Sequence, residues 1–494
     1  MFIEEIPLVN LKRISLPQSK YLTTIPDLSE AINIESIDLQ GCKSLVELPS
    51  SIQYLSKLEH LNLRLCKALK NLPCRIDSKF LREFHLTKCY NVNTCPEIFG
   101  NLKNLDLSWT AVKELPASIF KLTDLSYLDL TGCSKITKFP EASVFLKYLY
   151  LSETAIEEVP QSIQFLTGLV TLKLTNNKKL LSLSSSICKL KCLKTLDLSG
   201  CSKFECFPEI LEPMEVLATL RVSQTAIKYF PSPIENVKFL ETLHLNECKN
   251  LVSLPSNIHQ LSRLEEIDLT YCKGLLSLPK LPSSLILLKA NNCESLENLS
   301  SRSKCNFECI HFANCFKLDL KADAHLAIQL IASKLPSHRH QLKGIAFCIV
   351  IALEGSQSLP DIIFPIPCWI NCDCRVKADN FEGNAVIGSW QCFDIDVHLL
   401  ESDHVLLWYD PHSETSQTGL MDEKGWFNKY SDHEVSFDFC FQGLPELIHM
   451  LHCNIKKCGV RLLYVEANSK PSSMFDSDTE EEESNSKRIK YSSD

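Results

Sequence analysis

Cysteine and histidine side chains are the groups in this sequence that could hold a metal ion. The chain has 494 residues, of which 24 are cysteine and 14 are histidine. Neither of the two closest clusters has the spacing of common structural zinc sites, and alternation of cysteines suits one face of a strand better. We therefore expect no metal. The clusters are Cys368, Cys372 and Cys374, and His449, His452 and Cys453.

Catalysis by a nucleophile requires that residue, a base and an orienting group in one pocket. The histidines are scattered along the chain, and no Gly-x-Ser-x-Gly occurs. A phosphate-binding loop of the form Gly-x-x-x-x-Gly-Lys-Ser/Thr is also absent from the sequence. The sequence therefore predicts a protein that is not an enzyme and has no cofactor.

A repeated apolar pattern dominates the first 300 residues. Leu-x-x-Leu-x-Leu recurs, as in Leu58-x-x-Leu61-x-Leu63, and the second apolar position serves as a marker. Consecutive markers are 21 to 24 residues apart, which indicates a repeat architecture. The fourteen markers are Ile14, Ile37, Leu61, Phe84, Leu105, Leu128, Leu149, Leu172, Leu196, Leu220, Leu243, Ile267, Leu288 and Ile310.

Each unit is expected to contain one short strand and an irregular return path. The alternation Leu-x-Leu directs every second side chain inward. Downstream comes Cys-x-x-hydrophobic-x-x-hydrophobic-Pro, as in Cys66 to Pro73, and proline favours extended or turn conformations over long helices. A single unit cannot bury its apolar side alone, so the units must stack. The predicted fold is a leucine-rich-repeat solenoid, a horseshoe of about 14 repeats with little helix.

The cysteines of the repeats occupy one recurring position that turns inward. Threonine replaces cysteine there in three units (Thr110, Thr154 and Thr225), and Asn177 replaces it in another. Because these side chains share hydrogen bonding and small size, we expect them to bond turn carbonyls, with reduced thiols rather than disulfides. The cysteines are Cys42, Cys66, Cys89, Cys133, Cys201, Cys248, Cys272, Cys293 and Cys315.

Charge and hydropathy argue against nucleic acid and membrane as partners. The net charge is −9, and residues 476–494 contribute −4 of it from seven acids and three bases. No basic excess exists to neutralise phosphates, and no run of 18 apolar residues occurs. The start of the chain lacks the pattern of a secretory signal. We expect a cytoplasmic protein. The nucleus is an alternative, because residues 487–490 form a basic run within a solvated tail.

Four segments follow from these patterns. Residues 1–316 form the solenoid, and 317–343 form a connector with a short helix. Residues 344–467 form a β-rich domain, because 401–411, 435–439 and 456–464 are rich in β-branched and aromatic residues with period two, as strands are. Residues 468–494 form a disordered acidic tail.

The repeats resemble those of plant intracellular disease-resistance receptors, specifically the class with TIR and nucleotide-binding domains. The resemblance rests on segments 22–29, 45–52 and 195–202, and on the occurrence of Cys-x-x-Leu-x-x-Leu-Pro together with Thr-Ala-Ile units in the same chain. Ala313 to Leu318 resembles the junction of that family into a C-terminal jelly-roll/Ig-like domain. The resemblance implies that the repeats and this C-terminal β-sandwich domain sense pathogen effector proteins and restrain a nucleotide-binding switch.

The sequence departs from that family in three ways. The switch module is missing, and the repeats begin at residue 1 without a cap, so we expect a truncated product or a fragment. The Gly-x-x-Ile-Pro segment that the family has early in its C-terminal domain is also absent, so at least one strand there is expected to be lost.

Binding is expected on the exposed side of the strands, since packing does not dictate those residues. Trp109, Tyr150 and Tyr271 stand out because aromatic side chains are favoured anchors in protein interfaces, although each could instead pack along its neighbours. The predicted contact residues are Asn62, Arg64, His85, Lys88, Asp106, Trp109, Asp129, Tyr150, Glu153, Lys173, Arg221, Gln224, His244, Glu247, Asp268 and Tyr271.

Two functions of different classes remain open. The first is protein recognition in plant immunity, with a pathogen effector as the partner or a nucleotide-binding module supplied by another chain. The second is a repeat scaffold or adaptor unrelated to immunity, and a non-functional truncated receptor is a variant of the first.

Overall fold

The structure is a computed structural model of the whole chain. It describes residues 8–140, 144–230, 234–299, 309–312, 315 and 317, and six strands between residues 342 and 464. The chain divides into two compact units, Met1–Leu275 and Leu276–Asp494. Most of the connector predicted at 317–343, and the whole tail predicted at 468–494, lie outside the described residues. The boundary predicted at residue 316 stays a prediction.

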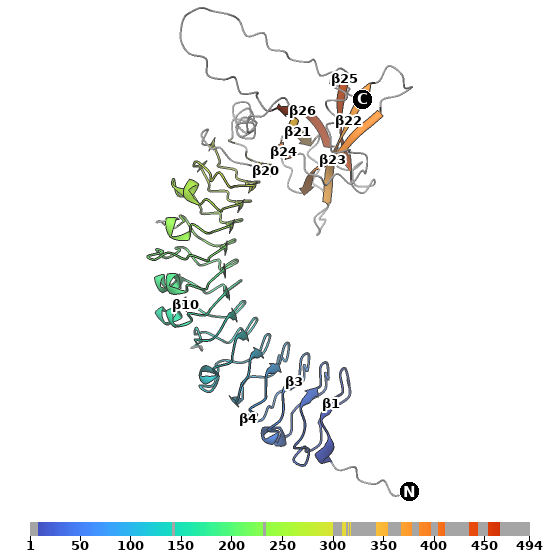
Figure 1. Cartoon of the computed structure of the whole chain (residues 1–494), viewed down its shortest axis with the longest axis vertical. Helices are drawn as coiled ribbons and strands as arrows, with labels where there is room; N and C mark the ends of the chain where they lie inside the picture. The colour runs from blue at the N-terminus through green and yellow to red at the C-terminus, as the bar shows by residue number, and fades with distance from the viewer. Residues whose placement is uncertain are drawn as a thin grey trace, which may run out of the picture. The chain divides into compact units, whose positions relative to one another are not determined.

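The first unit is built on one parallel sheet with a single three-residue strand from each repeat. The marker is the central residue of every strand and pairs in register with the marker of the next, as Leu61 does with Phe84. Figure 1 shows these strands along the inner side of the unit. In spatial order they are β1 (Arg13–Ser15), β2 (Ser36–Asp38), β3 (His60–Asn62), β5 (Glu83–His85), β7 (Asn104–Asp106), β8 (Tyr127–Asp129), β9 (Tyr148–Tyr150), β11 (Thr171–Lys173), β13 (Thr195–Asp197), β14 (Thr219–Arg221), β15 (Thr242–His244) and β16 (Glu266–Asp268).

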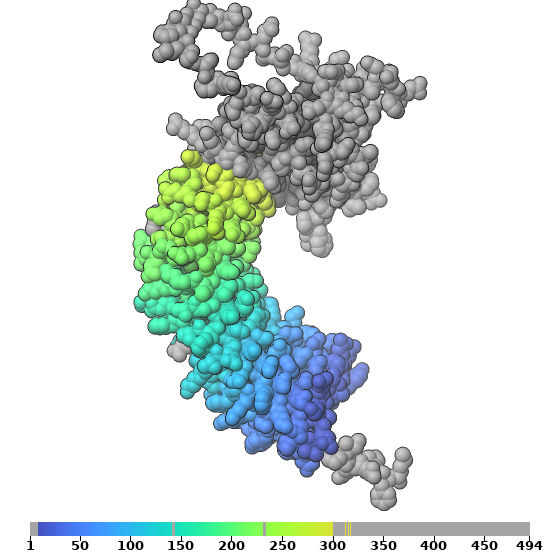
Figure 2. All heavy atoms as spheres, in the orientation of Figure 1, coloured from blue at the N-terminus to red at the C-terminus, as the bar shows by residue number. Residues whose placement is uncertain are grey.

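The core of this unit runs through the middle of the stack, between the strands and the return paths. Markers from Ile37 to Ile267 are at most 1% exposed, whereas Ile14 in β1 is only partly buried. Full burial of such a side chain is worth roughly 1.5–3 kcal/mol. The space-filling view shows consecutive units packed against each other without gaps (Figure 2). The predicted solenoid is therefore confirmed, and each unit is stabilised mainly by its neighbours.

The return paths consist of turns, short 3-10 helices and very short strands. Proline precedes two of the helices, where Pro49 and Pro160 have extended backbone that separates them from the preceding segment. No α-helix occurs among the described residues, which agrees with the small amount of helix predicted for the repeats. The 3-10 helices are η1 (Leu8–Asn10), η2 (Ser50–Tyr54), η3 (Ile119–Lys121), η4 (Gln161–Phe165), η5 (Ser185–Lys189), η6 (Ile234–Val237) and η7 (Ile258–Gln260), and the paired strands are β4 (Arg75–Asp77) with β6 (Glu97–Phe99) and β10 (Glu158–Val159) with β12 (Ser182–Leu183).

The cysteines form a ladder of hydrogen bonds between consecutive units, as predicted. In the first unit each of these Sγ atoms donates to a carbonyl of the preceding unit; in Cys66 the bond to Leu39 O is 3.1 Å long. Burial raises the pKa of the Cys66 thiol to about 12, so it stays a neutral donor. The cysteines whose side chains the structure describes are free thiols. The other bonds of this kind in the unit are made by Cys42, Cys89, Cys133, Cys201, Cys248 and Cys272.

The second unit contains the last described repeats and a set of long antiparallel strands. The strands β24 (His404–Asp410), β25 (Glu434–Gln442) and β26 (Cys453–Tyr464) confirm the predicted strands at 401–411, 435–439 and 456–464. β22 contains Cys368, Cys372 and Cys374, whose side chains lie outside the described residues. The parallel pairs are β17 (Ser277–Leu278) with β19 (Asn298–Leu299) and β18 (Leu287–Lys289) with β20 (Cys309–His311); the antiparallel sets are β20, β24 (His404–Asp410), β21 (Leu342–Leu353) and β26 (Cys453–Tyr464), and β23 (Ala385–Asp396), β22 (Pro367–Lys377) and β25 (Glu434–Gln442).

Within the described residues, no helix has the length and apolar character needed to cross a bilayer.

Candidate functional site

The concave face of the first unit presents two rows of side chains, one on each side of the markers. The leading row is the residue before each marker, and the trailing row is the residue after it. Sequence reasoning chose the trailing row and missed the leading row, although period two places both on one face. From β3 to β16 the leading row is His60, Glu83, Asn104, Tyr127, Tyr148, Thr171, Thr195, Thr219, Thr242 and Glu266, and the trailing row is Asn62, His85, Asp106, Asp129, Tyr150, Lys173, Asp197, Arg221, His244 and Asp268.

Seven predicted contact residues lie beyond the strands; one is Arg64, and the other six occupy the same position of the turn that follows each strand. Their backbone is left-handed, with φ between 55° and 63°. The residue after this turn residue occupies the recurring position of cysteine, threonine or asparagine, which we call the ladder position. These side chains therefore border the two rows instead of belonging to them. The six are Lys88, Trp109, Glu153, Gln224, Glu247 and Tyr271.

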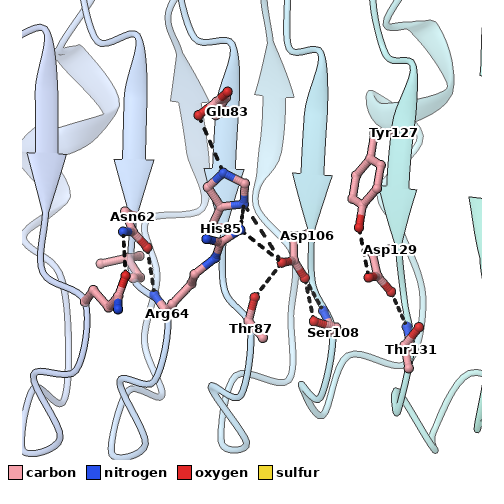
Figure 3. Close-up of polar contacts among 12 residues, drawn as sticks. Asn62, Arg64, Glu83, His85, Thr87, Asp106, Ser108, Tyr127, Asp129 and Thr131 are labelled. Carbon is pink, nitrogen blue, oxygen red and sulfur yellow. Dashed lines mark hydrogen bonds and ion pairs between the residues drawn. The ribbon is translucent and has the colours of Figure 1, made fainter. Parts of the chain in front are cut away.

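A polar cluster joins three neighbouring units at β3, β5 and β7 (Figure 3). Arg64 Nη2 lies 3.2 Å from His85 Nδ1 and 3.7 Å from Asp106 Oδ2. His85 Nε2 lies 3.6 Å from a carboxylate oxygen of Glu83. Asp106 is only 6% exposed, so its predicted exposure is wrong. The cause is local: its carboxylate is enclosed by Arg64 and by hydroxyls, including that of Ser108 at 2.6 Å.

The neutral form of His85 is favoured in this cluster. Burial lowers the pKa of the imidazole, and the nearby Arg64 guanidinium lowers it further, against the opposing effects of Asp106 and Glu83. A neutral ring protonated on Nε2 can accept from Arg64 at Nδ1 and present its N–H toward Glu83. The cluster therefore holds its own charges together and fixes the Arg64 side chain.

Acidic and amide side chains of the trailing row cap the ends of the strands. The Oδ1 of Asp129 accepts from the backbone N–H of Thr131 at 2.8 Å. Asp106 and Asp197 accept in the same way from residues two positions on. This is the local bonding that makes Asp and Asn frequent at such turns. Asn62 and Asp268, also predicted as contacts, have the same bond and the same structural role.

An aromatic patch follows the polar cluster along the same face. We use this name for Trp109, Tyr127, Tyr148 and Tyr150. The rings of Tyr127 and Tyr150 meet edge to face, with centroids 5.4 Å apart, and Tyr148 is paired with Tyr127 across β8 and β9. Trp109 is 36% exposed and Tyr148 is 39% exposed. The patch offers apolar area that neighbouring units only partly cover.

Contacts inside the patch hold its rings in place. The Tyr127 hydroxyl donates to Asp129 Oδ2 at 3.1 Å (Figure 3). Burial raises the pKa of Tyr150, with a further contribution from Asp129, so the phenol stays neutral. The Trp109 indole lies over Gly132, where an added Cβ would come within 2.5 Å of a ring atom. Trp109 therefore packs along its neighbour and is exposed at the same time.

The remaining predicted residues divide between paired and unpaired side chains. Gln224 donates to Glu247 at 2.8 Å, and His244 Nε2 lies 3.6 Å from Glu266. Lys173 Nζ lies 5.1 Å from the centre of the Tyr150 ring, a cation–π contact. Arg221 is half-buried in the trailing row next to His244. The face is thus suited to binding a protein surface, with rigid aromatic rings beside charged side chains.

Comparison with known proteins follows the same repeats. Residues 121–203 match the family described as "Disease resistance protein RPS4B-like, leucine-rich repeats". Disease resistance protein RPS4B of Arabidopsis thaliana is 30% identical over 96% of this chain and 40% of its own length. Disease resistance protein RPS6 of the same plant is 34% identical over 64% of this chain and 27% of its own length. The TMV resistance protein N of Nicotiana glutinosa is 30% identical over 47% of this chain and 17% of its own length.

The chain thus spans less than half the length of these curated relatives. Among solved structures, the Leptospira interrogans leucine-rich-repeat protein LIC12759 is 20% identical, covers 67% of this chain and 96% of its own, and has a TM-score of 0.40. The resemblance inferred from the repeat sequences is confirmed by the curated relatives.

Proposed function

This chain carries leucine-rich repeats of the kind found in plant disease-resistance proteins, and we propose that it is the protein-recognition part of an intracellular immune receptor. It acts by binding and not by catalysis. Its partner is a pathogen effector protein or a nucleotide-binding module supplied by another chain, and its place of action is the cytoplasm. In the resting state the bound module is restrained, and effector binding releases it.

The aromatic patch is the observation that carries this proposal. Trp109 and Tyr148 are each more than one third exposed on the concave face, beside Tyr150 and Tyr127. Tyr and Trp are the residue types that most often dominate the free energy of a protein interface, because they bury a large area and lose little side-chain entropy. The polar cluster at one side and the charged residues at the other provide the polar border that such interfaces have.

A binding experiment with matched variants tests the proposal. The full chain would be immobilised and exposed to a panel of pathogen effector proteins and to the nucleotide-binding domain of a related receptor. For any partner that binds, Trp109→Ala and Tyr150→Ala are expected to weaken the affinity at least about tenfold, which is about 1.4 kcal/mol and typical of an important contact. Tyr54→Ala is the control, because Tyr54 is 68% exposed in η2, on the return path.

Unchanged affinity in both concave-face variants would contradict the placement of the interface. Binding of no effector and no nucleotide-binding domain would contradict the function itself. A loss with the Tyr54 variant that equals the loss with Trp109 would move the interface to the return-path side.

A further inference from the structure

Two basic side chains next to the aromatic patch have no carboxylate partner. Lys173 in β11 and Arg221 in β14 both belong to the trailing row. Within the described part of the chain, neither of them forms an ion pair or a hydrogen bond through its side chain; the contact of Lys173 is with the Tyr150 ring. Arg64, the other arginine close to this row, is by contrast engaged with Asp106 and His85. The two cations are thus available to a ligand.

The carboxylates of the trailing row from β8 to β14 are already engaged in the turns. Asp197 lies between Lys173 and Arg221 in register, is only 9% exposed, and accepts from the Ser199 N–H at 2.9 Å. Asp129 accepts from the Tyr127 hydroxyl and from the Thr131 N–H. A carboxylate held by its own turn neutralises a neighbouring cation less than a close ion pair does. The stretch from β9 to β14 therefore combines apolar rings with two cations that form no close ion pair, and Glu153 at the turn after β9 is the exposed acid at its border.

The leading row of this stretch is neutral. Thr171, Thr195 and Thr219 occupy it on three consecutive strands, in register with one another. Threonine hydroxyls donate and accept hydrogen bonds and repel neither sign of charge. Thr242 continues this row in β15. β16 differs, since Glu266 lies in its leading row and Asp268 in its trailing row, so the neutral leading row ends there.

We propose that the aromatic patch together with Lys173 and Arg221 forms a docking surface for an acidic segment of the partner protein. In this segment an aromatic or large aliphatic side chain packs against the patch, and carboxylates follow it toward Lys173 and Arg221. The proposal rests on the proposed function and names the chemistry of the partner that the concave face would take.

The spacing of the strands fixes how long the segment must be. From Tyr150 in β9 to Arg221 in β14 there are three strand steps. At about 4.8 Å for each step the span is about 14 Å, which an extended peptide covers with about four to five residues. A segment with one apolar side chain, followed within four or five positions by two carboxylates, can therefore contact the aromatic patch and both cations at once.

Peptide selection against the full chain provides the test. The probe is a displayed library of random 12-residue peptides, panned on the wild-type chain at low ionic strength, where charge contributes most. Enriched peptides are expected to carry one aromatic or large aliphatic residue with two or more acidic residues within five positions. Their affinity should fall at least tenfold in Lys173→Glu and in Arg221→Glu, and should weaken as NaCl is raised. Lys138→Glu, at an exposed lysine of the return path, serves as the charge-matched control.

The outcomes separate this proposal from the proposed function. Enrichment of basic or uncharged peptides, or of none, would overturn the acidic-segment proposal, as would equal losses with the Lys138 control. The same variants would be assayed with any protein partner found for the chain. A partner that is lost with Trp109→Ala but binds Lys173→Glu and Arg221→Glu normally would leave the recognition function standing and remove the acidic segment.

Discussion

Replacing Asn177 with leucine should remove more stability than its size suggests. Asn177 occupies the ladder position after β11 and is completely buried. Its Oδ1 accepts from the backbone N–H and from the hydroxyl of Thr154, at 2.7 Å and 2.9 Å. Its Nδ2 donates to the Leu151 carbonyl at 3.0 Å. One side chain therefore joins two consecutive units by three bonds.

The size of the stability loss follows from the hydrogen bonds that a leucine cannot make. The Leu151 carbonyl keeps a donor, because the Thr154 hydroxyl also lies 3.0 Å from it. Leucine removes all three bonds of Asn177, each with a net value of about 0.5–1.5 kcal/mol, and the Thr154 N–H keeps an acceptor only by turning to the Leu151 carbonyl. Asn177→Leu is therefore expected to lower the free energy of unfolding by about 2–4 kcal/mol, although leucine has the same number and branching of side-chain heavy atoms as asparagine.

Asn177→Cys is the matched control, because two other units already contain that combination. Thr110 is followed in the next unit by Cys133, and Thr225 by Cys248, with the oxygen and sulfur atoms of each pair 3.3–3.4 Å apart. In the first of them the N–H of Thr110 donates to its own Leu107 carbonyl. The cysteine variant can adopt this arrangement and is expected to lose less than about 1 kcal/mol.

Urea unfolding followed by circular dichroism would measure both variants. Hydrogen exchange at the amides of β9 to β13 would show whether the loss begins there, since repeat proteins need not unfold in one step. A leucine variant within 1 kcal/mol of wild type, or as stable as the cysteine variant, would refute the view that hydrogen bonding selects the ladder residues.

Two further changes test the turn and the polar cluster. Gly132→Ala places a side chain at φ +74° and against the Trp109 indole, whereas Gly41→Ala meets the same backbone (φ +76°) with only a flexible Gln18 side chain 3.4 Å away. Urea unfolding should therefore show a larger loss for Gly132→Ala than for Gly41→Ala, and an equal loss would contradict the packing of Trp109. Because the folded-state pKa of His85 is lowered, its stabilising effect is complete above the ordinary histidine pKa of about 6.5 and is lost as the pH falls through the folded-state value. The free energy of unfolding should decline from pH 7 toward acid less steeply in His85→Gln than in wild type, and identical slopes would contradict that account.

Much of the fold could be predicted because its information is local and periodic. The marker and the apolar residues beside it recur every 21 to 24 positions, and every one of the fourteen markers is the centre of a strand. Alternation within a strand needs no knowledge of distant residues. The ladder could be predicted as well, because cysteine, threonine and asparagine share little besides small size and hydrogen bonding.

The candidate site was harder to predict from the sequence than the fold, because its contacts join different repeats. Asp106 looks exposed in the sequence, yet Arg64 and Thr87, which enclose it, come from earlier units. The missed residues of the leading row, such as Tyr127 and Tyr148, carried a usable signal, since they stand two positions before residues that were chosen. The strand-end bonds of Asp106 and Asp129 also had a signal, in the sequence Asp-Leu-Ser/Thr.

The aspartates that cap strand ends restrict which positions of the concave face can change to suit a partner. A trailing-row residue that caps its strand cannot change without leaving a turn N–H unbonded, so function has little freedom there. The trailing-row residues from β3 to β16 for which no such bond is found are His85, Tyr150, Lys173, Arg221 and His244. Of these, His85 is held by its cluster and His244 lies against Glu266. Tyr150, Lys173 and Arg221 remain, which is why the middle of the concave face is where a partner can select side chains without weakening the repeat that carries them.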